Sequence, residues 1–370
     1  MQRDNTPDWP IVALIGCYPP PFGGISVQLQ RLSDYLEQAG VEHTVYNTAS
    51  LAEDPPRILS VVAHRRWWYA KFLATHRCRI VHLLLVDWAA CVLFAIAATF
   101  RPGKYVLSIP GRNISQPLKS TIPGIAPLTR WMLRQMDTII ASNSDIARDC
   151  IGLGGISPER VCIIPAFIPP ATAKPSSIPE YIREYMSQHS PLLSAVGWIG
   201  ETYEGVDLYG LDMMMTLVKR LKGDHPRIGL IISVNGGPEN EVRETIRRAR
   251  HAAGDSILLV KESLSEFTPV AQQSALFLRP TNTDGDAVSI REALYVGTPV
   301  IASNAVPRPS PCVLFINRDI DDFEYHVREA LGDQEALKSR IAEYSVADNA
   351  ESMLLVYERL IRGEQYGSSE

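Results

Sequence analysis

Short apolar runs that alternate with helix-like segments constrain the fold of this chain more than any other feature. Continuous apolar runs are typical of parallel strands buried on both faces, and their alternation with helices is typical of α/β domains. The pattern occurs twice and predicts two doubly wound parallel sheets. The predicted strands are 11–16, 41–47, 79–86, 104–108, 137–141 and 161–165 in the first half, and 192–196, 228–234, 256–260, 275–278, 300–302 and 312–316 in the second.

Domain boundaries follow from length and from a change in composition. A chain of 370 residues is long enough for two domains with separate cores. Residues 169–190 are rich in proline and serine, which is typical of a linker. We therefore expect a Rossmann-like domain over 1–168, a second over 191–346, and an amphipathic helix within 347–370.

Charge and cysteine content exclude several classes of protein. A net charge of −5 and a pI near 6.0 give no reason to expect nucleic-acid binding. The six cysteines form no C-x-x-C pair, so we expect thiols in a reducing, cytoplasmic setting. The apolar stretch 83–100 is interrupted by Asp87, which favours a strand followed by a capped helix over a membrane span. Residues 1–10 are polar, and no signal peptide is expected there.

The stretch 275–304 predicts a strand, an acidic loop, a helix and a second strand. The helix is expected to begin near Ala287 and to end at Gly297. The first amides of such a helix, at Val288 and Ser289, can bind an anion. Asp284 and Glu292 can grip hydroxyl groups beside it.

A second glycine-containing loop follows the first predicted strand. Gly23 and Gly24 precede a helix expected over 25–39, and glycine lets a backbone approach an anion closely. A tight strand-to-helix turn explains the same pair. The loop lacks the G-x-G-x-x-G spacing of dinucleotide-binding folds, so a nicotinamide cofactor is not expected.

These motifs together resemble the retaining nucleotide-sugar glycosyltransferases of family four, which have the GT-B fold. The matching residues are Pro20-Pro21-Phe22-Gly23-Gly24, Asp284-Gly285, Glu292-Ala293 and Gly297-Thr298-Pro299-Val300. The resemblance implies that Glu292 holds the donor ribose, that Asp284 holds hydroxyls of the transferred sugar, and that Gly23-Gly24 faces the donor diphosphate. It also implies that the last helix crosses back onto the first half.

The chain departs from the family pattern at several places. Asp284 stands where Glu is usual, and Pro110-Gly111 stands where many relatives have His-Gly. The sugar contact of that His is therefore either lost or moved to Arg112 or Asn113. The loop 197–205 lacks the Arg and Lys that relatives use against the leaving diphosphate. Arg279 is our candidate replacement, although it equally suits an ion pair with Asp284 or Asp286. Lys261 is a weaker candidate.

We expect a metal-independent transferase that needs no side-chain nucleophile or cofactor. Asp284-Gly285-Asp286 also spells the D-x-D pair that binds a divalent cation in another glycosyltransferase fold, but the resemblance gives Asp284 a different role. The donor is a nucleotide-diphosphate sugar, bound also by Gly285, Asp286, Val288 and Ser289. His82 is expected to be a core histidine.

The acceptor implied by the resemblance is a saccharide or a lipid-linked glycan in cell-surface polysaccharide or glycoconjugate synthesis. Basic and aromatic residues in 64–79 suit an anionic membrane surface, and they equally suit an amphipathic helix that packs inward. The first interpretation predicts a peripheral protein on the cytoplasmic membrane face. The alternatives are a nucleotide-sugar epimerase of the same fold and a non-catalytic donor-binding subunit.

Overall fold

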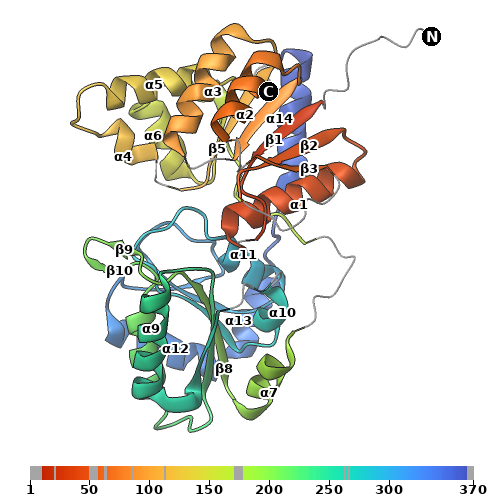
Figure 1. Ribbon diagram of the computed structural model, residues 1–370. Helices are drawn as coiled ribbons and strands as arrows, with labels where there is room; N and C mark the ends of the chain where they lie inside the picture. Colours follow the sequence, from red (N-terminus) through yellow and green to blue (C-terminus); the bar gives the residue numbers. More distant parts are fainter. Residues whose placement is uncertain are drawn as a thin grey trace. The chain divides into compact units, whose positions relative to one another are not determined.

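The chain divides into two compact units, one of which is formed by two separate segments. The computed structural model describes residues 11–20, 22–49, 57–61, 65–84, 87–111, 114–170, 178–261, 264 and 267–364. Unit 1 comprises Met1–Ala171 and Asp348–Glu370, and unit 2 comprises Thr172–Ala347 (Figure 1).

Unit 1 is built on a seven-stranded sheet in the order β3-β2-β1-β4-β5-β6-β7, with every pairing parallel. Its strands are β1 (Val12–Gly16), β2 (His43–Asn47), β3 (Ile58–Ser60), β4 (Ile80–Leu84), β5 (Lys104–Ile109), β6 (Thr138–Ala141) and β7 (Val161–Ile163). Its helices are α1 (Gly24–Gln38), α2 (Arg65–Thr75), α3 (Trp88–Phe100), α4 (Ser115–Leu118), α5 (Ile125–Gln135), α6 (Ser144–Gly152) and α14 (Asn349–Arg362).

Both faces of this sheet are buried. Alternate side chains of a strand point to opposite faces, and those of β1 join two different cores. Ala13 and Ile15 pack with α3 and α5, whereas Val12 and Leu14 pack with α1 and α14. The C-terminal helix therefore completes the core of unit 1.

Unit 2 is built on a six-stranded parallel sheet in the order β12-β11-β8-β13-β14-β15. Its strands are β8 (Leu192–Gly197), β11 (Gly229–Val234), β12 (Ile257–Val260), β13 (Leu276–Arg279), β14 (Val300–Ser303) and β15 (Val313–Phe315), beside the hairpin β9 (Thr202–Tyr203) and β10 (Val206–Asp207). Its helices are α7 (Glu180–Gln188), α8 (Leu211–Leu221), α9 (Glu239–Ala253), α10 (Thr268–Gln272), α11 (Val288–Tyr295), α12 (Ile320–Gly332) and α13 (Gln334–Ala342).

The prediction of two doubly wound parallel sheets is confirmed, and the differences are local. The short strand β3 and the β9–β10 hairpin were not predicted. Part of the predicted linker 169–190 is helical, because α7 buries Ile182 in the core of unit 2.

The apolar stretch 83–100 contains the predicted capped helix. The Asp87 carboxylate accepts hydrogen bonds from the amides of Ala89 and Ala90, at 3.0 and 3.2 Å, and so caps α3. No helix among the described residues is long and apolar enough to cross a membrane.

In α2 the aromatic side chains that the structure describes pack toward the sheet. Tyr69 and Phe72 are buried, and the Trp68 ring lies 5.0 Å from that of Tyr46. This part of 64–79 thus fits the inward-packing alternative better than a membrane surface. His64 and the side chain of Trp67 lie outside the described residues.

Candidate functional site

The predicted strand, loop and helix occur at the carboxyl edge of the sheet of unit 2. β13 ends at Arg279, α11 begins at Val288, and Gly297 follows the helix with a left-handed φ of 81°. Ligands of parallel α/β sheets bind at this edge. The local geometry expected from the sequence is therefore present.

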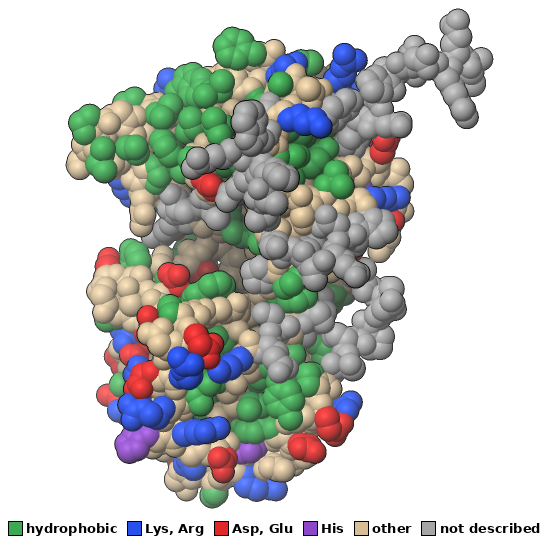
Figure 2. All heavy atoms as spheres, viewed as in Figure 1, with side chains coloured by type: hydrophobic (Ala, Val, Ile, Leu, Met, Phe, Trp, Pro, Cys, Tyr) green, Lys and Arg blue, Asp and Glu red, His purple; other side chains and the backbone are tan. Residues whose placement is uncertain are grey.

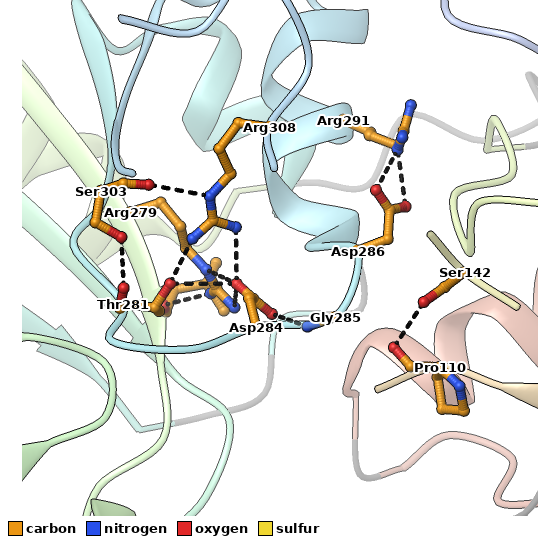
Figure 3. Close-up of polar contacts among 11 residues, drawn as sticks. Pro110, Ser142, Arg279, Thr281, Asp284, Gly285, Asp286, Arg291, Ser303 and Arg308 are labelled. Carbon is orange, nitrogen blue, oxygen red and sulfur yellow. Dashed lines mark hydrogen bonds and ion pairs between the residues drawn. The ribbon is translucent and has the colours of Figure 1, made fainter. Parts of the chain in front are cut away.

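Asp284 lies at the centre of a buried charge cluster (Figure 3). Its Oδ2 accepts hydrogen bonds from Arg279 Nε at 3.0 Å, from Arg308 Nη1 at 3.1 Å and from the Thr281 hydroxyl at 3.3 Å. Its Oδ1 accepts one from the Gly285 amide at 3.1 Å. One carboxylate oxygen thus carries most of the contacts, and the other faces the amide of the loop.

Arg308 was not identified from the sequence, although its side chain is only 2% exposed. Besides Asp284 it binds the Thr281 hydroxyl through Nη2 at 2.7 Å and the Ser303 carbonyl through Nε at 3.3 Å. Arg308 follows β14, the strand next to β13. Its position shortly after the predicted strand 300–302 is the sequence signal that could have identified it.

Arg279 has a partner for each guanidinium nitrogen. Nε and Nη2 contact Asp284, the latter at 2.9 Å, and Nη1 donates to the Val196 carbonyl at 3.3 Å. The guanidinium carbon also lies 5.1 Å from the centre of the Tyr209 ring. This is the ion-pair alternative that the sequence left open, with Asp284 rather than Asp286 as the partner.

The cluster carries more positive than negative charge. Burial raises the pKa of Asp284, but Arg279 and Arg308 outweigh it and hold that pKa below its usual value. For Arg279, burial lowers the pKa and the Asp284 charge more than reverses the effect. Burial lowers the pKa of Arg308, whose usual value is far above neutrality. Two guanidinium groups therefore face one carboxylate, which leaves a surplus positive charge beside the loop.

Asp286 forms a separate ion pair with the first turns of α11. Both of its carboxylate oxygens lie 2.8 Å from Arg291 Nε. Arg291 also reaches the Tyr344 hydroxyl at 3.4 Å. Each acid of the D-x-D sequence is thus bound by arginine, and no cluster of three His, Cys, Asp or Glu suited to a metal occurs in the described part of the chain.

The N-terminus of α11 opens onto this loop. Ala287 is the N-cap, and within the described residues no side chain caps the helix. The first amides belong to Val288 and Ser289, as predicted, and Glu292 is half-buried one turn later. Residues one turn apart lie on the same helix face, so Glu292 is placed near those amides.

Lys261 is not brought to this cluster. It follows β12, and β11 and β8 lie between β12 and β13 in the sheet. At about 4.8 Å per strand, this order separates the two strand ends by about 14 Å. The Lys261 ammonium group instead lies 3.5 Å from the Glu239 carboxylate.

The predicted residues of unit 1 lie on their expected elements. Gly23 is the N-cap of α1, where its amide donates to the Ser26 hydroxyl at 2.9 Å. A Cβ at Gly23 would meet only that hydroxyl oxygen, at 4.0 Å. Pro110 follows β5, and its carbonyl accepts from the Ser142 hydroxyl at 3.0 Å (Figure 3). Arg112 and Asn113 lie outside the described residues.

His82 is the core histidine that the sequence suggested. Its Nε2 lies 2.7 Å from the Ser108 hydroxyl, and its Nδ1 bonds to the Tyr357 hydroxyl. Burial lowers its pKa to about 3. The ring is therefore neutral, and it ties β4 and β5 to α14.

Comparisons with known proteins agree with this architecture. Residues 23–166 match the family model of a glycosyl transferase 4-like domain. No curated protein sequence matches.

Several solved structures share the fold over nearly the whole chain. Sucrose-phosphate synthase from Thermosynechococcus elongatus aligns with a TM-score of 0.68 and 14% identity over 95% of this chain and 99% of that one. MnaA of S. aureus, solved with UDP, aligns with a TM-score of 0.64 and 16% identity over 95% of this chain and 96% of that one. HepE of Anabaena in complex with UDP aligns with a TM-score of 0.61 and 12% identity over 95% of this chain and 97% of that one. Residues 23–166 are therefore similar to glycosyl transferase 4-like domains, and the chain as a whole has the GT-B fold.

Proposed function

We propose that the chain is a retaining glycosyltransferase that moves a hexose-type sugar from a nucleotide-diphosphate sugar to a saccharide or lipid-linked acceptor. The observation that carries this proposal is the half-exposed loop of unit 2, where the α11 N-terminus, Glu292 and a buried cluster with surplus positive charge lie together. The fold and the glycosyl transferase 4-like domain support it.

The charge that develops on the departing diphosphate must be stabilised. We assign that role to the amides of Val288 and Ser289 together with the surplus charge of Arg279 and Arg308. These arginines act from within the cluster, because each already binds Asp284. The Gly23-Gly24 loop stays our candidate for a further contact with the diphosphate.

The two acids receive different roles. Glu292 holds the donor ribose. Asp284 contacts the transferred sugar through Oδ1, since Oδ2 is already bound by both arginines. No side-chain nucleophile is assigned.

Metal independence is also part of the proposal. A cation at Asp284 or Asp286 would have to displace Arg279 and Arg308 or Arg291 from those carboxylates. Removing a partner from a buried ion pair is costly. Transfer should therefore persist in excess EDTA, and its loss and recovery with Mn²⁺ would contradict this part.

The donor proposal is tested first with UDP and UDP-sugars, because two of the solved structures with this fold are complexes with UDP. Glu292→Gln should abolish transfer and weaken nucleotide binding in calorimetry. Glu358→Gln, on the exposed face of α14, is the matched control and should behave as wild type. Normal turnover by Glu292→Gln would defeat the assignment, and the anomeric configuration of the product, read by NMR, decides between retention and inversion.

The alternatives predict different products. An epimerase converts the nucleotide sugar without an acceptor, whereas a donor-binding subunit binds it and forms no product alone. A reducing, cytoplasmic setting belongs to the proposal as well. It is supported by the cysteines, which are all free thiols.

A further inference from the structure

Gln28 of α1 is a buried polar side chain whose hydrogen-bonding groups are not used. It is only 3% exposed, and in the described part of the chain its carboxamide has neither a donor nor an acceptor. The other buried polar side chains of this helix all form hydrogen bonds, and they are Ser26, Arg31 and Ser33. A buried polar group without a partner costs folding free energy, so Gln28 requires an explanation that its packing does not give.

Helix geometry directs the Gln28 side chain toward the beginning of α1. Side chains of a helix tilt toward its N-terminus, so a residue lies over the one four positions before it. For Gln28 that residue is Gly24, which is exposed and has no side chain to fill the space. The amides of Gly24 and Ile25 have no acceptor within the helix, because they belong to its first turn. The carboxamide is therefore placed at the carboxyl edge of the unit 1 sheet, where parallel sheets bind ligands.

The loop between β1 and α1 is held at both ends by buried polar side chains. The Tyr18 amide donates to the Asn47 side-chain oxygen at 2.8 Å, and Asn47 is fully buried at the end of β2. The Gly23 amide donates to Ser26 Oγ at 2.9 Å, and this hydroxyl donates to the Gly23 carbonyl at 3.0 Å. The backbone beside Gln28 is thus fixed before a ligand binds, as a specific contact requires.

The surroundings of Gln28 in the sequence are uncharged. Residues 11–30 contain no Asp, Glu, Lys, Arg or His. Figure 2 likewise shows fewer charged side chains over the visible part of unit 1 than over unit 2. A carboxamide both donates and accepts hydrogen bonds, as a hydroxyl group does, whereas an ionised phosphate only accepts. The free group of Gln28 therefore suits a hydroxyl of a neutral ligand better than it suits a phosphate.

We propose that Gln28 binds a hydroxyl group of a sugar substrate and contributes to the choice of that sugar. The inference rests on the proposed transferase function, and it adds a residue to which the matched motifs give no role. The sugar hydroxyl supplies the hydrogen bonds that the carboxamide lacks. A sugar without that hydroxyl leaves the buried carboxamide unpaired, which is how such a contact discriminates between substrates.

Gln28→Met separates this role from a structural one. Methionine keeps the length of the side chain and removes the carboxamide, so the variant loses an unpaired buried polar group. We expect its urea midpoint to equal or exceed that of wild type, while its affinity for the sugar falls about tenfold. A residue needed only for folding would lower the midpoint. Gln38→Met, at the exposed end of α1, is the matched control and should change neither quantity.

Two binding experiments on the full chain distinguish the two possible sources of the hydroxyl. One compares UDP with UDP-glucose and UDP-galactose in calorimetry, and a donor-sugar contact predicts that Gln28→Met weakens only the UDP-sugars. The other uses methyl glycosides of glucose, galactose and mannose in saturation-transfer NMR with UDP present, and an acceptor contact predicts that the variant weakens these. In either case one monodeoxy analogue should bind wild type and Gln28→Met equally, because it lacks the contacted hydroxyl.

Unchanged sugar binding by Gln28→Met in both experiments overturns the inference. So does a lower urea midpoint of this variant together with a weakening of UDP itself, which would indicate a folding defect. Failure of wild type to bind UDP and UDP-sugars contradicts the proposed donor instead, and the methyl glycosides then still decide whether Gln28 contacts a sugar. Wild type that binds UDP, gains nothing from the attached sugar and binds none of the glycosides also overturns the inference.

Discussion

At the residue scale, the most consequential arrangement is the binding of one carboxylate oxygen of Asp284 by two arginines. The sequence identified Asp284, and it identified Arg279 as a cation with two possible partners. It did not identify Arg308, because that residue is brought to Asp284 only when β14 pairs with β13. The spacing of residues in the sequence predicts which side chains of one loop lie together. Partners that come from the adjacent strand can be predicted only when the order of the strands in the sheet is known.

Arg308→Met tests the importance of this cluster. The change leaves Asp284 buried with one arginine and removes a donor from Thr281, so we expect a loss of about 3 kcal/mol in the free energy of unfolding. Urea denaturation measures it. Arg247→Met is the matched control, because the ion pair of Arg247 with Glu244 is exposed to solvent and is worth about 1 kcal/mol or less. Equal losses in the two variants would contradict a structural role for Arg308.

His82 predicts a pH dependence of stability. Its native pKa of about 3 lies below the usual value of about 6.5, so the unfolded chain binds a proton between these values and the folded chain does not. The stabilisation is complete above pH 6.5 and is lost as pH falls toward 3, by at most about 1.4 kcal/mol per pH unit.

His82→Gln, which does not titrate, should show a shallower fall in unfolding free energy between pH 6 and 4. The measurement is a series of urea titrations across that range. His251→Gln, at an exposed position on α9, is expected to keep the slope of wild type. Parallel profiles for wild type and His82→Gln would show that His82 is not the source of the acid sensitivity.

At the scale of elements, strands buried on both faces were readily predicted, and short or edge elements were not. The central strands are continuous apolar runs, whereas β3 and the β9–β10 hairpin offer only two or three residues each. α7 was assigned to a linker because neighbouring prolines dominate the composition, although Ile182 packs in the core. Periodicity is reliable where burial is complete, and it fails where few residues carry the pattern.

Glycine positions in unit 2 give a prediction about how elements approach each other. Gly210 has a left-handed φ of 67°, and a Cβ there would lie 2.4 Å from the carbonyl oxygen of Pro280. Gly297 has a φ of 81° and no atom within 4 Å of such a Cβ. Alanine strains the backbone at both sites by about 1 kcal/mol, and at Gly210 it also forces the loop after β13 away.

Gly210→Ala should therefore destabilise the protein by at least about 2 kcal/mol more than Gly297→Ala, as measured by urea denaturation. It should also weaken nucleotide binding, because the displaced loop carries Asp284 of the proposed donor site. Asn282 in the same loop bonds to the Asp207 carbonyl at 2.7 Å, and this contact would be strained as well. Similar stabilities of the two variants would mean that the loop after β13 can move at little cost.

At the scale of the whole molecule, the two units differ in how the chain builds them. Unit 2 is one continuous segment with its own sheet and cores, whereas unit 1 needs the C-terminal helix α14. α14 contributes Met353, Val356 and Tyr357 to the core of unit 1, and Tyr357 bonds to His82. Each buried apolar side chain contributes about 2 kcal/mol, so losing the helix removes a large share of a typical domain stability of about 5–15 kcal/mol.

A fragment of residues 172–347 should therefore fold cooperatively alone, and a fragment of residues 1–171 should not. Circular dichroism with urea denaturation checks both. Adding a peptide of residues 348–370 to the 1–171 fragment should restore a cooperative transition, because the peptide supplies the missing side of the core. Because we assign the nucleotide to unit 2, the 172–347 fragment should also bind UDP in calorimetry, and Glu292→Gln should weaken that binding. A fragment that folds and does not bind any nucleotide would move the donor site away from α11, while the cooperative folding of unit 2 would still stand.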